Sequence, residues 1–369
     1  MASNVYFWNL RTNLNQPFHK RMAKLLELAG LRGIVQENDL TALKLHFGER
    51  GTTGFLRPLW LKPVIDAVLA IGGKPFLTDA STLYVGQRGE AVSHAMQAAR
   101  HGFDAMTLGA PVIIADGLKG GYQEEVAVKG KHLKSAFIAG AITEANSFIS
   151  VNHFKGHELA GYGGALKNIG MGCASKQGKM QQHMTTGPTV HQDKCVGCGS
   201  CVRICAAKAL SLDEGARVVL NEELCVGCGG CFLACKNGGL EINWKTDVAH
   251  FLEKMMEYAA AVLVPKAGRC LHLNFVMDVV PDCDCVGFTD LPICPDLGIL
   301  ASSDPVACDQ AAMDLVNAAP PLYAGKLPKG YEPGQNKFRA LHPHVPEDFG
   351  LGYAESLGLG SREYELKKI

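Results

Sequence analysis

CVGCGSCVRIC at residues 195–205 and CVGCGGCFLAC at residues 225–235 decide how this chain of 369 residues is organised. The second stretch repeats the first, and each spaces its four cysteines as C-x2-C-x2-C-x3-C. Together they hold eight of the 14 cysteines, and no cysteine precedes Cys173. So dense a repeated pattern marks a small unit with its own architecture, set apart from the sequence on either side.

The composition excludes several classes of protein. Apolar residues make up 47% of the chain, charged residues 20%, and 36 basic side chains balance 36 acidic ones. These values exclude a largely disordered chain and argue against nucleic acid as the main partner. No apolar run approaches the ~18 residues of a transmembrane helix, and the start MASNVYFWNLRTN lacks a secretory signal. We therefore expect a cytoplasmic protein that does not bind membranes, with reduced cysteines that ligate metal.

The cysteine spacing is that of bacterial ferredoxins with two 4Fe–4S clusters. Three cysteines of one run reach a single cluster, whereas the fourth lies too far along and reaches the other cluster. Zinc held by CxxC pairs is the alternative, but it needs only four ligands, usually in two separated pairs. The spacing assigns Cys195, Cys198, Cys201 and Cys235 to one cluster, and Cys225, Cys228, Cys231 and Cys205 to the second.

Strand and helix patterns alternate on both sides of this insert. Apolar alternation predicts strands, and a spacing of three or four predicts helices, so the alternation indicates an α/β fold with a mostly parallel sheet and flanking helices. We expect strands at 5–10, 42–47, 75–78, 148–153 and 270–276, and helices at 16–29, 59–71, 87–100, 247–264 and 304–318. The predicted division is an α/β host domain at 1–187 and 245–369, interrupted by a ferredoxin-like α+β insert at 188–244. We expect Ser303 to cap the helix at 304–318, and the tail from about 319 to be irregular until a short terminal helix.

The stretch SVNHFKGHELAGYGGALKNIGMGCASKQGKMQQH at 150–183 carries the main candidate site. On a helix, His153 and His157 would share a face and could bind a metal; in a turn they would be structural or would act on a substrate. The glycines allow close approach to a ligand, although a solvated loop would look similar. No acidic residue lies between Leu159 and Gln192, so a positive rim should suit a small anionic substrate or cofactor. The catalytic candidates here are His153, Lys155, His157 and Lys167, and the cofactor-binding candidates are Gly161, Gly163, Gly164, Asn168 and Lys176.

Two further stretches contribute candidates. In PDCDC at 281–285, a strand would point Asp282 and Asp284 one way and two cysteines the other. Paired carboxylates can bind a hard cation, act as acid and base, or fix a lysine, so both join the catalytic candidates. The cysteines outside the repeats are expected to be small buried apolar groups, except that lysines near Cys173 should lower its pKa. Polar groups that follow two predicted strands give weaker candidates: His46, Glu49, Asp79, Ser81, Thr82 and Arg88.

Several blocks together resemble one family. The blocks are HFGE at 46–49, DASTLYVGQR at 79–88, HFKGHELAGYGGALKNIGMGCASKQGK at 153–179, and PDCDC with DLGILASSDPVACDQA at 281–311. Together they are similar to the family named domain of unknown function 362, in the form that carries a ferredoxin-type insert. The resemblance implies an α/β host domain with a 4Fe–4S insert. It supplies no substrate.

Three functions follow from this sequence. The first is an iron–sulfur oxidoreductase, in which electrons from a redox partner protein pass through two 4Fe–4S clusters to a substrate or cofactor in the host domain. The second is a non-catalytic electron-transfer or assembly module that docks on a larger redox enzyme. The third is a metal-dependent enzyme with structural clusters, which would hold an additional metal. A polar cavity lined by the candidate residues would favour an enzyme over a docking module.

Overall fold

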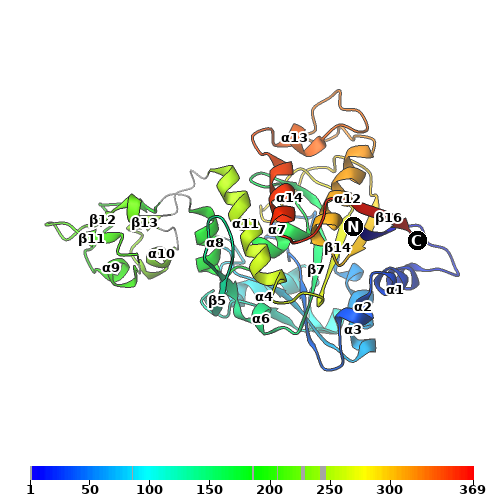
Figure 1. Cartoon of the computed structure of the whole chain (residues 1–369), viewed down its shortest axis with the longest axis horizontal. Helices are drawn as coiled ribbons and strands as arrows, with labels where there is room; N and C mark the ends of the chain where they lie inside the picture. Colours follow the sequence, from blue (N-terminus) through cyan, green and yellow to red (C-terminus); the bar gives the residue numbers. More distant parts are fainter. Residues whose placement is uncertain (1, 85, 185–186, 206, 226–228, 242–246) are drawn as a thin grey trace.

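The centre of the molecule is an eight-stranded sheet (Figure 1). The computed structural model describes the chain except residues 1, 85, 185–186, 206, 226–228 and 242–246. In sheet order the strands are β16 (Tyr364–Lys368), β1 (Ser3–Trp8), β15 (Gly298–Ser302), β14 (Cys270–Val276), β7 (Ser147–His153), β2 (Leu40–Lys44), β3 (Lys74–Asp79) and β4 (Val112–Ile114). Neighbouring strands run parallel except where β15 pairs with β1 and β14. The mostly parallel α/β fold is thus confirmed.

Helices cover both faces of this sheet, because side chains of successive strand residues point to opposite faces. In β7, Phe148 packs into one apolar core and Ile149 into the other. The first core is covered by α7 (Ala165–Gly170), α11 (Val248–Leu263), α12 (Pro305–Ala318) and α14 (Glu347–Ser356). The second is covered by α1 (Phe18–Leu28), α2 (Leu31–Ile34), α3 (Lys62–Ile71) and α4 (Ala91–Arg100).

Shorter elements complete the body around the sheet. Two hairpins lie outside it, one formed by β5 and β6 and the other by β8 and β9. The remaining elements are η1 (Pro58–Trp60), α5 (Ala105–Leu108), β5 (Gln123–Ala127), β6 (Ser135–Ala139), α6 (Gly140–Glu144), β8 (Lys155–His157), β9 (Gly161–Gly163), α8 (Lys176–His183) and α13 (Lys337–Leu341).

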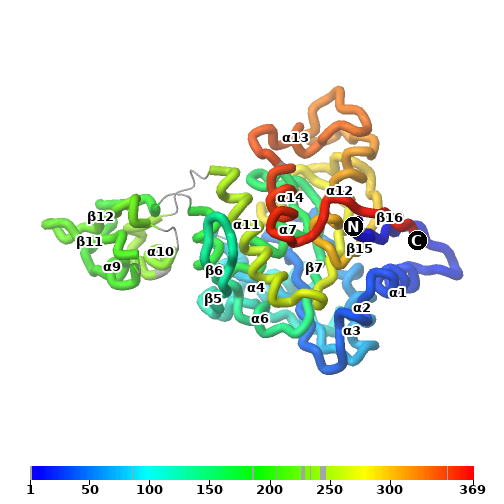
Figure 2. The backbone as a smooth tube through the Cα atoms, viewed as in Figure 1, coloured from blue at the N-terminus to red at the C-terminus, as the bar shows by residue number. Residues whose placement is uncertain are grey.

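The cysteine repeats lie in a small lobe apart from the layered body, at the left of Figures 1 and 2. Its elements are β10 (Thr189–Val190), α9 (Ser200–Ile204), β11 (Leu210–Leu212), β12 (Val218–Leu220), η2 (Glu222–Leu224), α10 (Gly230–Ala234) and β13 (Leu240–Glu241). Strands from before and after the lobe pair in the main sheet, since β7 lies beside β14. The division at 188 and 244 stays a prediction, and residues 242–246 lie outside the described part.

The structure corrects two expectations about the C-terminal part. Asp304, not Ser303, caps α12: the helix begins at Pro305, and the Asp304 carboxylate accepts a hydrogen bond from the Ala307 N–H at 2.9 Å. The chain also ends in a strand, not a helix. β16 pairs in parallel with β1, and its Tyr364 and Leu366 pack against the first core. Among the described residues, no helix is both long and apolar enough to cross a membrane.

Candidate functional site

A cavity of about 180 Å³ opens at the carboxyl ends of β2, β3 and β7. Ligands in α/β proteins bind at this edge of the sheet, because the loops that follow the parallel strands meet there. Lys44 and His46 lie at the end of β2, Asp79 ends β3, and His153 ends β7. Helices α7 and α8 and the loop that holds Cys285 close the cavity.

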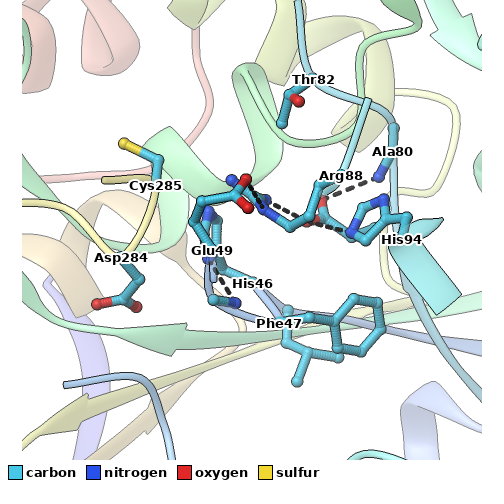
Figure 3. A network of polar contacts seen from close by, with 12 residues as sticks. His46, Phe47, Glu49, Ala80, Thr82, Arg88, His94, Asp284 and Cys285 are labelled. Atoms are coloured by element: carbon cyan, nitrogen blue, oxygen red, sulfur yellow. Dashed lines mark hydrogen bonds and ion pairs between the residues drawn. The ribbon is translucent and has the colours of Figure 1, made fainter. Parts of the chain in front are cut away.

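Asp79 is the buried anion around which the cations of this cavity gather; one of them is Arg88, which Figure 3 shows beside His94. Its carboxylate lies 2.9 Å from the Lys44 Nζ, 3.2 Å from the Arg88 Nη1 and 3.7 Å from the His94 Nε2. Burial by itself would raise the pKa of Asp79, but the charges of Lys44 and its other cationic neighbours hold it well below its usual range. Asp79 therefore stays ionised and fixes Lys44 and Arg88 at the cavity.

Arg88 joins the loop after β3 to the loop after β2. Its Nε lies 3.5 Å from the Glu49 carboxylate, and its Nη2 donates to the Tyr84 hydroxyl. The Glu49 N–H in turn donates to the Asp284 carbonyl at 2.8 Å. Four predicted candidates thus line one cavity: His46, Asp79, Thr82 and Arg88. Glu49 is not part of the lining and pairs with Arg88. Ser81 does not take part, because its hydroxyl and N–H donate to Asp116 at 3.0 Å.

His46 faces the cavity with one ring nitrogen already engaged. Its Nδ1 accepts a hydrogen bond from the Gly48 N–H at 3.1 Å. Burial, together with the charge of Arg88, holds the pKa of His46 well below its ordinary value. The ring is therefore neutral, and its Nε2–H is the donor that it can offer to a ligand.

His153 is held by four oxygen atoms and does not form a metal pair with His157. Its Nδ1 lies 3.0–3.1 Å from the two Asp284 carboxylate oxygens, and its Nε2 lies 3.0 Å from the carbonyls of Met277 and Asp278. Both ring nitrogens are therefore already occupied by acceptors of the protein. His153 therefore positions Asp284 more readily than it transfers a proton to a ligand.

Asp284 is buried and carries a second cation. The Lys155 Nζ lies 3.0 Å from its Oδ2. Burial would raise the pKa of Asp284, but His153 and Lys155 outweigh this effect and hold it well below its usual range. The structure separates it from Asp282, whose carboxylate pairs with Lys326 outside the cavity lining. These residues do not form a strand, since 284–285 form a turn.

Two sulfurs and one imidazole gather beside Lys167. The ligand atoms of His157, Cys283 and Cys285 all lie within 4.8 Å of one another, a spacing that could hold a metal ion. The Lys167 Nζ lies 3.5 Å from the Cys283 Sγ, and the Cys285 N–H donates to the same sulfur at 3.4 Å. Cys285 and Lys167 line the cavity. His132, His250 and Glu253 form a second group of this kind.

The glycine segment contributes backbone to the cavity and only part of the expected side chains. Gly163 and Gly164 line it, whereas Gly161 and Lys176 are not part of the lining. Gly164 must be glycine, because a Cβ there would overlap the Asp309 carboxylate, which accepts from the Ala165 and Leu166 N–H groups.

Asn168 lines the cavity, but its amide serves the protein. Its Oδ1 accepts from the Lys44 Nζ at 2.7 Å, and its Nδ2 donates to the Asn152 Oδ1 at 2.7 Å. Asn168 therefore positions Lys44. Cys173 departs from expectation: it is fully buried, and burial raises its pKa to about 12 despite the nearby Lys44.

The sequence prediction missed Lys44 and His183, both of which line the cavity. Lys44 is the last residue of β2, and it is buried at 1% exposure. A lysine at the end of an apolar strand is the signal that could have found it, since lysine is almost never fully buried unless paired. His183 ends α8, and nothing in its local sequence distinguishes it.

Two small cavities in the lobe follow the predicted cysteine sets. One is lined by Cys195, Cys198, Cys201 and Cys235. The other is lined by Cys205, Cys225 and Cys231, and Cys228 lies outside the described residues. Each cavity thus combines cysteines of one repeat with the fourth cysteine of the other.

Comparisons with known proteins identify a family and include a likeness to a solved structure. A family model described as "Domain of unknown function (DUF362)" matches residues 41–314. The chain is similar to the lactate racemase apoprotein from Thermoanaerobacterium thermosaccharolyticum, with 14% identity and a TM-score of 0.36 over 75% of this chain. The chain spans 51% of that protein, and a likeness this distant says nothing about activity. No curated protein matches.

Proposed function

The chain belongs to the DUF362 family, and because the family's description names no activity, we propose a function from the site itself. We infer that the protein is an iron–sulfur oxidoreductase. The cysteine lobe would hold two 4Fe–4S clusters, and electrons would pass from them to a small anionic substrate or cofactor in the host-domain cavity. A separate redox protein would supply the electrons.

The chemistry of the two cysteine cavities fits such clusters. Their exposed lining is almost wholly apolar apart from the sulfurs. Backbone N–H groups donate to cysteine sulfurs, from Val218 to Cys195 at 3.4 Å and from Ala209 to Cys205 at 3.2 Å. N–H donors of this kind stabilise the negative charge of cluster sulfurs and tune the reduction potential. The clusters would supply one-electron transfer.

The observation that carries the proposal is the packing of the second cysteine set on α8. Gly229, in the second repeat, lies so close to Met180 that a Cβ there would overlap its side chain. Met180 and Met184 form an apolar contact with Phe232 of the lobe and Leu83 of the host domain. Leu83 also lines the main cavity, as do Lys179 and His183 of the same helix. One helix therefore links the cysteine lobe to the cavity.

The first cysteine set suits the entry of electrons. Cys198 of this set is exposed, whereas among the described cysteines of the second set Cys205 and Cys225 are partly exposed and Cys231 is buried. A partner protein would reach the first set most easily, and the second set lies against α8. The proposed path is thus partner, first set, second set, cavity.

The charges of the cavity favour an anionic substrate. Five cationic side chains line it, against the carboxylates of Asp79 and Glu158. The cations are Lys44, Lys155, Lys167, Lys179 and Arg88. Burial lowers the pKa of Lys179 to about 8, although Asp116 and Asp79 oppose the shift. Near neutral pH, Lys179 can therefore bind an anion as a cation and also release a proton to a reduced product.

The cavity also separates this proposal from that of a docking module. A module without its own reaction would need no polar cavity at the carboxyl edge of the sheet. Here that edge carries a cavity with buried, charged side chains of perturbed pKa, which is typical of a binding or catalytic site.

Anaerobic purification of the whole chain, with iron and sulfide analysis and electron paramagnetic resonance, tests the clusters and their pairing. We expect Cys235→Ser to alter the same cluster signal as Cys198→Ser, and Cys205→Ser the same signal as Cys225→Ser. Cys173→Ala, in the buried host core, is the matched control and should leave both signals unchanged. Stoichiometric zinc without iron would refute the proposal, and pairing of Cys205 with Cys198 would refute the crosswise assignment.

A further inference from the structure

Cys283 and Cys285 form a pair of thiols at the wall of the cavity. Their sulfurs lie within 4.8 Å of each other, and the turn between them brings the Cys285 N–H to 3.4 Å from the Cys283 sulfur. Cys285 lines the cavity, whereas Cys283 is 2% exposed behind it. Figure 3 shows Cys285 and Asp284 on one loop beside Glu49. One sulfur can therefore meet a ligand while the other stays shielded.

The surroundings of these sulfurs suit a thiolate better than a metal ion. The His157 Nδ1 accepts hydrogen bonds from the N–H groups of Leu159 and Ala160 at 3.1 and 3.2 Å. A histidine that binds metal through one nitrogen almost always donates a proton from the other, so this pattern leaves Nε2 as a proton donor. Lys167, whose ammonium lies 3.5 Å from the Cys283 sulfur, would repel a cation and attract a thiolate.

We propose that Cys283 and Cys285 are a redox-active dithiol, which stores two electrons beside the cavity and passes them to a small organic disulfide bound there. The inference rests on the proposed function only for the source of the electrons. The pair itself depends on the geometry of this loop.

The electron count of the step balances. In the oxidised state, one S–S bond joins Cys283 to Cys285; it takes up two electrons and one proton, the bond breaks, and a Cys283 thiolate and a Cys285 thiol form. Two one-electron carriers, as predicted for the two cysteine sets, supply that number of electrons. No further reductant is needed within the chain.

Thiol–disulfide exchange returns the pair to its oxidised state. Cys285 holds the proton of the reduced pair, because its hydrogen bond to Cys283 and its burial raise its pKa. As the Cys283 thiolate takes up this proton, the Cys285 sulfur attacks one sulfur of the substrate disulfide and releases one thiolate. The Cys283 sulfur then passes that proton to the first product, attacks Cys285, releases the second thiolate and closes the Cys283–Cys285 bond. The second product takes its proton from solvent.

The charges around Cys283 support its role as the attacking thiolate in the second step. The hydrogen bond from Cys285 and the ammonium of Lys167 hold the pKa of Cys283 well below its ordinary value, although burial opposes them. Lys167 stays charged, because the neighbouring sulfurs raise its pKa against the effect of burial. Replacement of Lys167 should therefore destabilise the reduced pair relative to the disulfide.

Thiol trapping of the full chain in dithiothreitol redox buffers tests the pair without involving the clusters. Alkylation and mass spectrometry of the peptide that contains both cysteines should show them oxidised together, in one two-electron transition. Lys167→Gln should favour the disulfide about tenfold, which is a shift of about 30 mV to more negative potential. Lys329→Gln, at an exposed lysine, is the control and should leave the transition unchanged. Failure of the pair to oxidise together overturns the inference and leaves the proposed function intact.

A second arm tests the electron source. Photoreduction of the oxidised chain by a deazaflavin should regenerate both thiols in the native protein and fail to do so in the Cys198→Ser, Cys225→Ser double variant. A pair that cycles with dithiothreitol but is reduced equally in both proteins supports the dithiol and overturns its supply by the clusters.

Discussion

Replacement of Asp79 by asparagine is the perturbation that most sharply tests the buried charge network. The side chains of Asp79, Lys44 and Arg88 are 1–4% exposed, so solvent does not screen them. Asparagine keeps the size and one acceptor but removes the charge, which leaves two buried cations without their shared anion. Removal of one partner from a buried ion pair costs about 3–5 kcal/mol, and we expect a loss of this size in the free energy of unfolding.

Denaturant unfolding followed by circular dichroism measures this loss. The control is Asp66→Asn, since Asp66 pairs with Lys62 on α3 while both side chains are 42–52% exposed. Exposed pairs of this spacing contribute about 0.3–0.5 kcal/mol, so the control should stay close to the native protein. A loss below about 1 kcal/mol in Asp79→Asn would refute the argument that this carboxylate holds the cations of the cavity in place.

Three further predictions concern the same region. Burial lowers the pKa of His94 to about 3, so below pH 6.5 a proton binds this side chain in the unfolded chain but not in the folded one. The His94 contribution should therefore lower the free energy of unfolding by roughly 1.4 kcal/mol per pH unit from 6.5 towards 3. In denaturant unfolding, His94→Gln should show a smaller dependence of this free energy on pH. Gly164→Ala should lower the free energy of unfolding by about 1–3 kcal/mol, because the new Cβ would overlap Asp309. As the control, the Cβ of Gly33→Ala meets no atom within 4 Å, so this variant should be neutral or stabilised. Equal melting temperatures of the two variants would contradict this prediction. Asp284→Asn should lower the free energy of unfolding by about 3–5 kcal/mol, because the buried Lys155 and His153 lose their carboxylate partner. Asp282→Asn is the control: Asp282 pairs with the half-exposed Lys326, so the loss should be under about 1 kcal/mol.

The sequence predicted the layered part of the fold because its signal is local. Apolar alternation placed β1, β2, β3, β7 and β14, and a spacing of three or four placed the main helices. The end of the chain was mispredicted, because β16 is stabilised by pairing with β1, more than 350 residues away in sequence. Similarly, PDCDC alternates as a strand does, yet its residues are held in a turn by partners from other elements.

The sequence predicted which residues line the candidate site better than it predicted what each of them does. The sequence pointed to His46, Asp79, Arg88 and Lys167, which do line one cavity. It did not reveal that His153 would be engaged by four oxygens, since those acceptors come from loops more than 120 residues away. The titratable groups can be identified from the sequence, whereas their protonation depends on neighbouring residues that become known only from the fold.

The measurement that tests the central claim most directly is the iron content and spin state of the anaerobically isolated chain. The account predicts about eight iron and eight sulfide per chain and, after reduction, two interacting one-electron signals. Iron for one cluster only, or zinc in place of iron, would contradict it.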